Sequence, residues 1–365
     1  MKISLSKIIV LVLLITSSLL GKDIISFNSY SKSEFSPTRK QSFNIPFKIS
    51  VNAKVIVDLY TPDGNKIRTI SSAKELKKGK HSLIWDGKDS TGTIVPDEAY
   101  VVVLKAINKQ ATTTIDPRLY SGGEIETSLK TKITLDGKTI YNLSKPSRVL
   151  IRAGIKDGPM VRSLINWVPK PKGKNIQHWN GYDADKIVNA IETNRYGIVV
   201  VAFALPEYSI ITTGNTKLSY LQYYKNKNYK FKQVSKKEQL NQRGNKGISP
   251  HYYSFRITDR DPNININFPI NIKKNKKGIA LFNNNEAIPI KVTMPIEDEN
   301  FMEKSKYEVS FFVDFEFKSE EELGFMPITW LWSPNALSKG KHILSVNISG
   351  FNGQVGVKNI EFEIK

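Results

Sequence analysis

An internal repeat limits what this chain of 365 residues can fold into more than any other feature of its sequence. Residues at eight positions recur 94 positions further along, with no insertion or deletion between Val55 and Asp89. A period of about 90 to 100 residues is the size of one β-sandwich domain, so the repeat predicts at least two such domains in tandem. The matched residues are Val55, Asp63, Gly64, Arg68, Gly79, Trp85, Gly87 and Asp89 in the first copy and Val149, Asp157, Gly158, Arg162, Gly173, Trp179, Gly181 and Asp183 in the second.

Apolar residues in the first copy alternate with polar ones, as they do in strands that are buried on one face. The alternation runs through residues 42–51 and again through 55–60. Pro62-Asp63-Gly64-Asn65 follows as a turn, because Pro presets its backbone angle and Gly tolerates a positive φ. Short strands separated by frequent turns are typical of antiparallel sandwiches, so the fold class is predicted as all-β.

A third sandwich is expected at the C-terminus. Residues 307–317 alternate in the same way, and residues 360–364 fit a final strand. The run 337–344 also resembles 76–83, at an offset of 261 positions. The expected architecture is therefore a series of tandem immunoglobulin-like β-sandwiches, two of them defined by the repeat and the third by its strand pattern.

The first 22 residues have the pattern of a signal peptide. Lys2 and Lys7 give a positive start, residues 8–15 are all apolar, and small residues follow at 16–21. This apolar run is shorter than the ~20 residues that span a bilayer, and no later stretch reaches that length. We expect export to the periplasm or cell surface and no transmembrane span in the mature chain; the alternative is a buried N-terminal strand.

These patterns divide the chain into six parts. The stretch after the second sandwich breaks the strand pattern, and it has a helical pattern around residues 234–242. The expected boundaries are 1–22 for the signal peptide, 23–34 for an N-terminal linker, 35–116 for the first sandwich, 117–208 for the second, 209–255 for a basic linker or insertion rich in Tyr and Lys, and 256–365 for the third sandwich.

The absence of cysteine and a net charge of +20 restrict the chemistry and the partners. Without thiols the domains must be held by hydrophobic burial, and sites that need Cys ligands are excluded. A charge of this sign often accompanies nucleic-acid binding, but outside the cytoplasm an envelope protein or an anionic envelope polymer is the expected partner. The alternative is a composition biased toward Lys, Asn and Ile that has no binding role. The sequence leaves the oligomeric state open.

One longer motif in the first copy points to a known module. It comprises Phe35-Ser36-Pro37, then Val55-x-Val57-x-Leu59-Tyr60-x-x-Asp63-Gly64, then Gly79-x-His81-x-x-x-Trp85-Asp86-Gly87-x-Asp89-x-x-Gly92-x-x-Val95-Pro96-x-x-x-Tyr100. This motif resembles the Ig-like domain of flagellar hook-capping proteins (FlgD-type), which also occurs in other secreted bacterial proteins. The resemblance implies an exported scaffold. Glu98, with Asn194 in the second copy, departs from the family's usual glycine, and a hook-capping protein itself carries no cleaved signal.

The repeated Trp and Asp residues are interpreted as structural. Each Trp is large and near a turn, so it is expected to close the end of its sandwich, and the Asp side chains can bind backbone amides of the loop. The alternative is a calcium site at Asp86 and Asp89, which would need six to eight oxygen ligands. The residues of this motif are Trp85, Asp86, Gly87, Asp89, Trp179, Gly181 and Asp183.

No motif for catalysis is present. The sequence has no metalloprotease HExxH, no GxSxG elbow and no phosphate-binding GxxxxGK[ST] loop. The positions of the four His residues, His81, His178, His251 and His342, indicate packing roles. We therefore expect no enzyme activity, no cofactor and no metal.

The segment from Lys217 to Lys246 is the candidate interaction surface. It contains nine basic residues and one acidic residue, Glu238, with tyrosines between them. Lysines attract anions, and tyrosines present flat amphipathic faces. The alternative is a flexible linker. The candidate residues are Lys217, Tyr223, Tyr224, Lys225, Lys227, Tyr229, Lys230 and Lys232.

Three functions fit these observations. The first is an exported, non-enzymatic structural or binding protein of the bacterial envelope, such as a scaffold or adhesion protein. The second is an accessory component of a flagellar or secretion machine, which the module resemblance implies. The third is a non-catalytic module of an extracellular hydrolase system.

Overall fold

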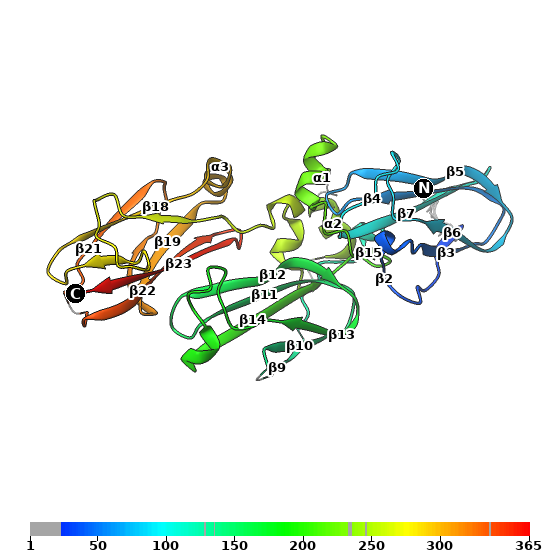
Figure 1. Cartoon of the computed structure of the whole chain (residues 1–365). Coiled ribbons are helices and arrows are strands. Elements are labelled where there is room, and N and C mark those ends of the chain that lie inside the picture. The colour runs from blue at the N-terminus through cyan, green and yellow to red at the C-terminus, as the bar shows by residue number, and fades with distance from the viewer. Residues whose placement is uncertain (1–22, 128, 135, 233–235, 245–246, 336) are drawn as a thin grey trace, which may run out of the picture.

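The computed structural model describes residues 23–365 except 128, 135, 233–235, 245–246 and 336. The expected signal peptide, residues 1–22, lies outside the described residues. The described chain confirms the predicted fold class, because it forms three consecutive immunoglobulin-like β-sandwiches (Figure 1). No helix in this part of the chain combines the length and the apolar character needed to cross a bilayer.

The first sandwich packs two sheets face to face, and all of their strand pairs are antiparallel except β2 with β15, which is parallel. One sheet has the order β1-β3-β6, and the other has the order β2-β15-β7-β4-β5 with β8 paired to β7. Every second residue of β3 and β4 is buried, so the alternation in the sequence forms the core. The strands are β1 (Ile25–Phe27), β2 (Glu34–Phe35), β3 (Phe43–Ile49), β4 (Ala53–Tyr60), β5 (Lys66–Leu76), β6 (Gly79–Trp85), β7 (Ala99–Ile107), β8 (Thr112–Ile115) and β15 (Ile210–Thr212).

The second sandwich repeats this plan with sheets β13-β10-β9 and β12-β11-β14. The strand β11 begins 94 residues after β4, and β12 begins and ends 94 residues after β5. The sequence repeat is thus a repeat of strands in the same order. The strands are β9 (Lys130–Ile133), β10 (Lys138–Leu143), β11 (Ser147–Ile155), β12 (Met160–Lys170), β13 (Gly173–His178) and β14 (Tyr196–Ala204).

The third sandwich has the same topology without the repeated sequence motif. Its sheets are β16-β18-β21 and β17-β23-β22-β19-β20, so β18 to β22 take the places of β3 to β7. Trp332 pairs with the first residue of β18, just as Trp85 pairs with the first residue of β3. The strands are β16 (Asn265–Asn267), β17 (Ala280–Phe282), β18 (Ile288–Thr293), β19 (Tyr307–Val313), β20 (Glu316–Glu321), β21 (Ile328–Trp332), β22 (Gly340–Gly350) and β23 (Val355–Ile364).

The similarity between residues 337–344 and 76–83 does not mark equivalent strands. Residues 337–344 lead into β22, which takes the place of β7 in the third sandwich. Residues 76–83 lead into β6 instead. Both runs nevertheless form the same local structure, because His81 and His342 each bond the carbonyl four residues earlier, at 2.7 and 2.8 Å. The match therefore reflects a shared turn and not a shared position in the domain.

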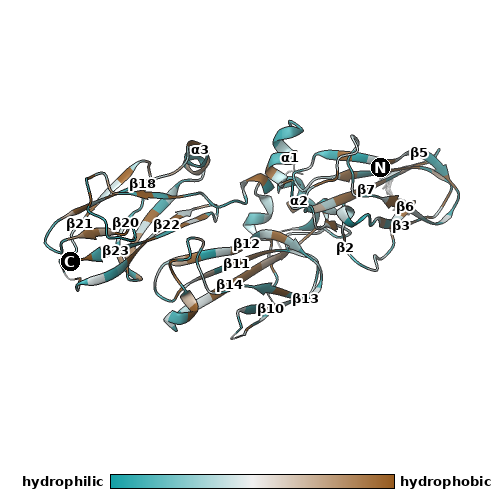
Figure 2. Cartoon of the chain, in the orientation of Figure 1, coloured by the Kyte–Doolittle hydropathy of each residue, from teal (hydrophilic) through white to brown (hydrophobic). Residues whose placement is uncertain are grey.

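The chain returns to the first sandwich after completing the second. β15 pairs with β7 and β2, and β1 pairs with β3, so segments expected to be linkers supply strands of the first sandwich. Two hydrophilic helices follow β15 and lie between the first and third sandwiches (Figures 1 and 2). The helices are α1 (Tyr220–Asn226), α2 (Lys236–Arg243), α3 (Ile296–Ser305) and the 3-10 turns η1 (Pro37–Arg39), η2 (Pro117–Leu119), η3 (Ala190–Thr193), η4 (Pro250–Tyr253) and η5 (Arg256–Thr258).

Candidate functional site

The two repeated tryptophans lie at equivalent ends of their sandwiches. Trp85 is fully buried and Trp179 is 5% exposed. The Trp85 Nε1 donates to the carbonyl of Lys88 at 2.9 Å, and the Trp179 Nε1 donates to that of Tyr182 at 2.8 Å. Each indole therefore fixes the loop that follows it. We call residues 85–95 the first docking loop and residues 179–190 the second docking loop.

One carboxylate oxygen of the repeated Asp shapes each docking loop. The Asp89 Oδ1 accepts from the backbone amides of Thr91 and Thr93 at 2.9 and 3.0 Å. The Asp183 Oδ1 accepts from those of Ile187 and Val188 at 2.8 and 3.1 Å. Through these bonds each Asp stabilises its loop, as Ser, Asn and Asp side chains commonly do in turns.

The other carboxylate oxygen binds a later part of the chain. The Asp89 Oδ2 accepts from the Tyr223 hydroxyl at 2.8 Å and lies 2.8 Å from the Lys227 ammonium. The Asp183 Oδ2 accepts from the Asn359 side chain of the third sandwich at 2.8 Å. The two loops thus act as docking points for different partners within the same chain.

The surroundings of Asp89 do not favour calcium. Although burial alone would raise the pKa of Asp89, hydrogen bonds from Lys227, Thr91 and Tyr223 lower it, so the carboxylate is ionised and already has cationic and neutral donors. An ammonium beside Oδ2 occupies a position that a cation would need. Within the described residues, no group of three or more His, Asp or Glu side chains is arranged to hold a metal ion.

The basic segment lies against the first docking loop instead of projecting from it. Tyr223 is 1% exposed, and Tyr224 and Tyr229 are partly buried, so these rings are not a free stacking surface. This corrects the interpretation of Tyr223 as a contact for an outside partner, because burying the phenol against a carboxylate stabilises the docked segment. Of the candidate lysines, those that are exposed are Lys217, Lys225, Lys230 and Lys232.

Asp63 holds the same segment at a second point. Its Oδ2 accepts from the Tyr220 hydroxyl at 3.0 Å, and its Oδ1 accepts from the backbone amide of Arg256 at 2.8 Å. Burial raises the pKa of Asp63 to about 6, against the lowering effect of these hydrogen bonds. The turn residue predicted from Pro62-Asp63-Gly64-Asn65 is therefore also a docking residue.

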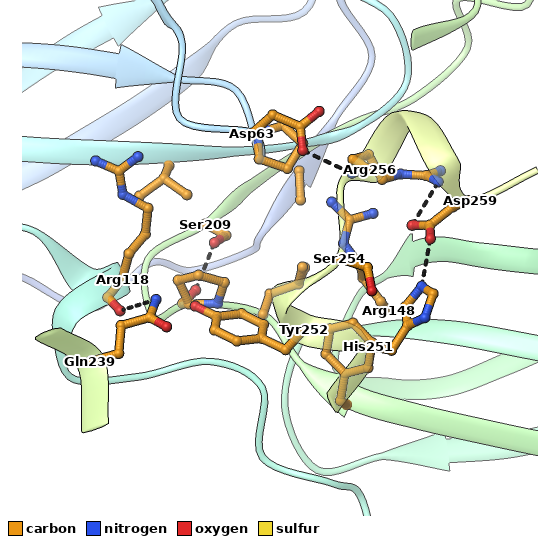
Figure 3. Close-up of a pocket in the computed structure, with 16 residues that line it drawn as sticks. Asp63, Arg118, Arg148, Ser209, Gln239, His251, Tyr252, Ser254, Arg256 and Asp259 are labelled. Atoms are coloured by element: carbon orange, nitrogen blue, oxygen red, sulfur yellow. Dashed lines mark hydrogen bonds and ion pairs between the residues drawn. The ribbon is translucent and has the colours of Figure 1, made fainter. Parts of the chain in front are cut away.

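A buried ion cluster joins the first sandwich, the second sandwich and the segment after them (Figure 3). Glu98 is fully buried and lies 2.7 Å from Arg148 of β11 and 2.5 Å from Arg256 of η5. Arg256 also contacts Asp259 at 3.1 Å, and Asp259 contacts His251 at 2.5 Å. Burial would raise the pKa of Glu98, but the two guanidinium groups lower it, so Glu98 stays ionised.

The cavity at this cluster is small. It measures about 50 Å³, and Arg148, His251, Arg256 and Asp259 line it together with Tyr252 and Gln239. One water occupies about 10–15 Å³ of such a cavity, whereas ligand pockets measure about 300–1,000 Å³. The cluster therefore has room for a few waters and serves to hold the domains together, and the packing of His251 on Trp167 at 4.2 Å belongs to the same contact.

Sequence reasoning gave no role to Glu98, Arg148 or Arg256. The one available signal was Glu98, which stands where the FlgD-type motif usually has glycine. Its partners lie 50 and 158 residues away along the chain, so no local pattern connects them.

Comparisons with known proteins find similarity over a short stretch of the chain. No protein-family model matches the chain. A stretch of 55 residues is 38% identical to the basal-body rod modification protein FlgD of Salmonella typhimurium, and equally to that of Salmonella typhi. The stretch is 15% of this chain and 23% of those relatives, so the chain spans about a quarter of the length of the curated relatives it matches.

Three solved structures are also similar to the chain, each with a low TM-score. FlgD from P. aeruginosa is 25% identical and covers 25% of this chain and 70% of that chain, with a TM-score of 0.22. A tetra-tandem repeat from the extending region of a large adhesion protein is 9% identical, with a TM-score of 0.19. The match covers 93% of this chain and 73% of that chain. A Ca²⁺-stabilised adhesin of an Antarctic bacterium is 8% identical, with a TM-score of 0.20. The match covers 94% of this chain and 74% of that chain. The fold assignment therefore depends on the strand pairing described above.

Proposed function

We propose that the protein is an exported, non-enzymatic structural or binding protein of the bacterial envelope, in which the first two sandwiches form one rigid unit. The observation that carries this proposal is Glu98, a fully buried carboxylate that joins Arg148 of the second sandwich to Arg256 of the following segment. Breaking such a pair leaves a buried charge without its partner, which costs about 3–5 kcal/mol. The two sandwiches therefore resist separation.

A rigid pair of sandwiches suits a protein that holds or reaches a partner. The docking contacts use the same repeated loop design twice, and the segment between the second and third sandwiches is tied to the first sandwich at Asp63 and Asp89. The cavity at the ion cluster, about 50 Å³, is too small for a substrate and is lined by groups that join the domains. These features support presentation of a surface more than turnover of a substrate.

Export is supported by the sequence at residues 1–22 and by the identity of one stretch to a basal-body rod modification protein. The test is cell fractionation with mass spectrometry of the native protein. We expect the protein in the envelope or medium with an N-terminus between Leu19 and Asp23. A folded protein that keeps Met1 and stays in the cytoplasm would overturn the proposal.

A second candidate is an accessory component of a flagellar or secretion machine. The 38% identity to FlgD over 55 residues favours it. The test is the motility and secretion of a strain that lacks the gene, together with co-purification of the protein with basal bodies. Unchanged motility and secretion, with no co-purification, would overturn this second candidate.

A further inference from the structure

A groove runs between the first two sandwiches, apart from the buried ion cluster. It has a volume of about 590 Å³, within the range of about 300–1,000 Å³ that is usual for ligand sites. Its walls are the N-terminal segment 30–34, the turn 171–174 between β12 and β13, and residues 208–209 between β14 and β15. Ligand sites often lie between domains, and here the ion cluster fixes the two domains that form the walls.

The groove is positively charged. Lys32, Lys172 and Lys174 line it, and Glu34 is the one acidic residue among the lining residues. All three lysines are exposed, and among the described residues no ion pair engages them. Their ammonium groups are therefore available to an anion, and ammonium groups that converge in a groove raise the local concentration of anions.

Aromatic rings form the other part of the wall. Tyr208 stacks on Phe27 with ring centroids 4.2 Å apart and lies 5.5 Å from Tyr30. Its backbone has a φ of 57°, which is costly for a bulky side chain and is found more often at functional sites than elsewhere. The packing against Phe27 and Tyr30 thus holds Tyr208 at the groove in a conformation that the chain would not adopt locally.

The backbone of the walls is fixed by hydrogen bonds to neighbouring strands. The amide of Ile211 donates to the carbonyl of Ser33 at 2.7 Å, and the amide of Leu205 donates to that of Pro146 at 2.8 Å. The groove is therefore formed before a ligand binds, and binding loses little conformational entropy.

We propose that this groove binds an anionic glycan, a chain of sugars that carries carboxylate or phosphate groups. The lysines suit the charged groups, and Tyr208, which is partly exposed beside its stacking contact with Phe27, suits contact with a sugar ring. A peptide fits less well, because Pro146 and Pro171 in the walls lack amide donors for strand addition. The inference depends on the proposed function, since it names the class of envelope polymer that the protein binds.

The test is calorimetric titration of the full mature chain with three trisaccharides, which are a uronic acid trimer, a phosphorylated trimer and an uncharged trimer. We expect at least one charged trimer to bind and the uncharged one to bind at least tenfold more weakly. Preference between the two charged trimers distinguishes carboxylate from phosphate as the natural group. Equal binding of all three, or of none, would overturn the proposal.

The internal repeat provides a matched control. Lys172→Gln with Lys174→Gln removes two charges from the groove, and Lys78→Gln with Lys80→Gln removes two from the equivalent turn of the first sandwich, outside the groove. We expect the first pair to weaken binding at least tenfold and to reduce its salt dependence, and the second pair to change binding less than twofold. Equal effects of the two pairs would contradict the site. Envelope localisation that persists while glycan binding is absent would refute the groove and leave the proposed function standing.

Discussion

The two domain junctions differ in how deeply their ion pairs are buried. The junction of the first and second sandwiches encloses Glu98 and Arg148, which are 0% and 8% exposed at their side chains. The junction of the second and third sandwiches uses neutral bonds, in which the side chain of Asn347 accepts from the amide of Met160 at 2.7 Å and donates to its carbonyl at 3.1 Å. Its ion pairs are partly exposed. The side chains of Arg152 and Asp261 are 13% and 22% exposed, those of Lys358 and Asp185 are 31% and 23% exposed, and those of Arg195 and Glu316 are 45% and 57% exposed.

This difference indicates how each junction responds to stress. Buried ions that are separated lose their partners in a poorly solvated place, so the first junction should open only when its domains unfold. Neutral bonds and solvated ions can exchange with water, so the second junction should open at low cost.

The largest expected effect comes from removing the ring beneath each docking loop. Trp85→Ala and Trp179→Ala should each lower the free energy of unfolding by about 3–5 kcal/mol, because each leaves a large cavity. Trp85→Ala should also release the segment around Tyr223, whereas Trp179→Ala should loosen the third sandwich. Urea denaturation and limited proteolysis of the full chain measure both effects, and a loss below ~1 kcal/mol would contradict the buried roles.

Glu98→Ala tests the first junction directly. It leaves Arg148 and Arg256 without their carboxylate and should destabilise the joined first and second sandwiches by about 3 kcal/mol. Thermal unfolding should change from one shared transition of these two sandwiches to two separate transitions. If the variant keeps a single transition at the wild-type temperature, the ion cluster does not join the domains.

Asp63 gives the same junction a pH dependence. The pKa of Asp63 is about 6 in the folded chain, against an ordinary value of 3.8 for an aspartate carboxyl. Because the folded chain favours the protonated carboxyl, Asp63 stabilises the fold fully below about pH 4, and this stabilisation is lost as the pH rises through 6. Asp63→Asn should therefore stabilise the chain by about 2–3 kcal/mol at pH 7.5 relative to its effect at pH 4.5. Urea denaturation of both proteins between pH 4.5 and 7.5 measures this difference. Parallel pH profiles would show that Asp63 is not titrating there.

The second junction should respond much less to loss of a charge. Asp185→Asn removes the partner of Lys358 at a partly exposed position, so the free energy of unfolding should fall by less than ~1 kcal/mol. The matched comparison is Glu98→Ala. A loss as large as that of Glu98→Ala would remove the contrast between the two junctions.

The smallest effect on stability is expected at the exposed lysines of the basic segment. Lys225, Lys230 and Lys232 changed together to Gln should alter the free energy of unfolding by less than about 0.5 kcal/mol for each residue. If an anionic envelope partner uses this segment, binding to isolated envelope material should weaken and become less dependent on salt. Lys227→Gln is the contrasting variant, because Lys227 contacts Asp89 and should affect docking. Full binding by the triple variant would mean that the segment only connects domains.

Local patterns predicted the strands well because their causes are local. Alternation with period two buries one face of a strand, and this pattern located β3, β4 and β19. The shared turn before His81 and His342 was also a correct local similarity, but it occurs in strands that are not equivalent. A run of eight residues determines a turn and does not determine which strand of a sandwich follows it.

The sequence by itself determined the all-β class, the repeat of two sandwiches and the loops that follow Trp85 and Trp179, since hydrophobic alternation and turn residues act over a few neighbours. Only the tertiary structure decided that β15 returns to the first sandwich, that Tyr223 is buried on Asp89, and that Glu98 joins two arginines. These contacts link residues up to 158 positions apart. Their formation depends on how whole sheets pack, and a buried charge such as Glu98 is stable only where that packing brings its partners to it.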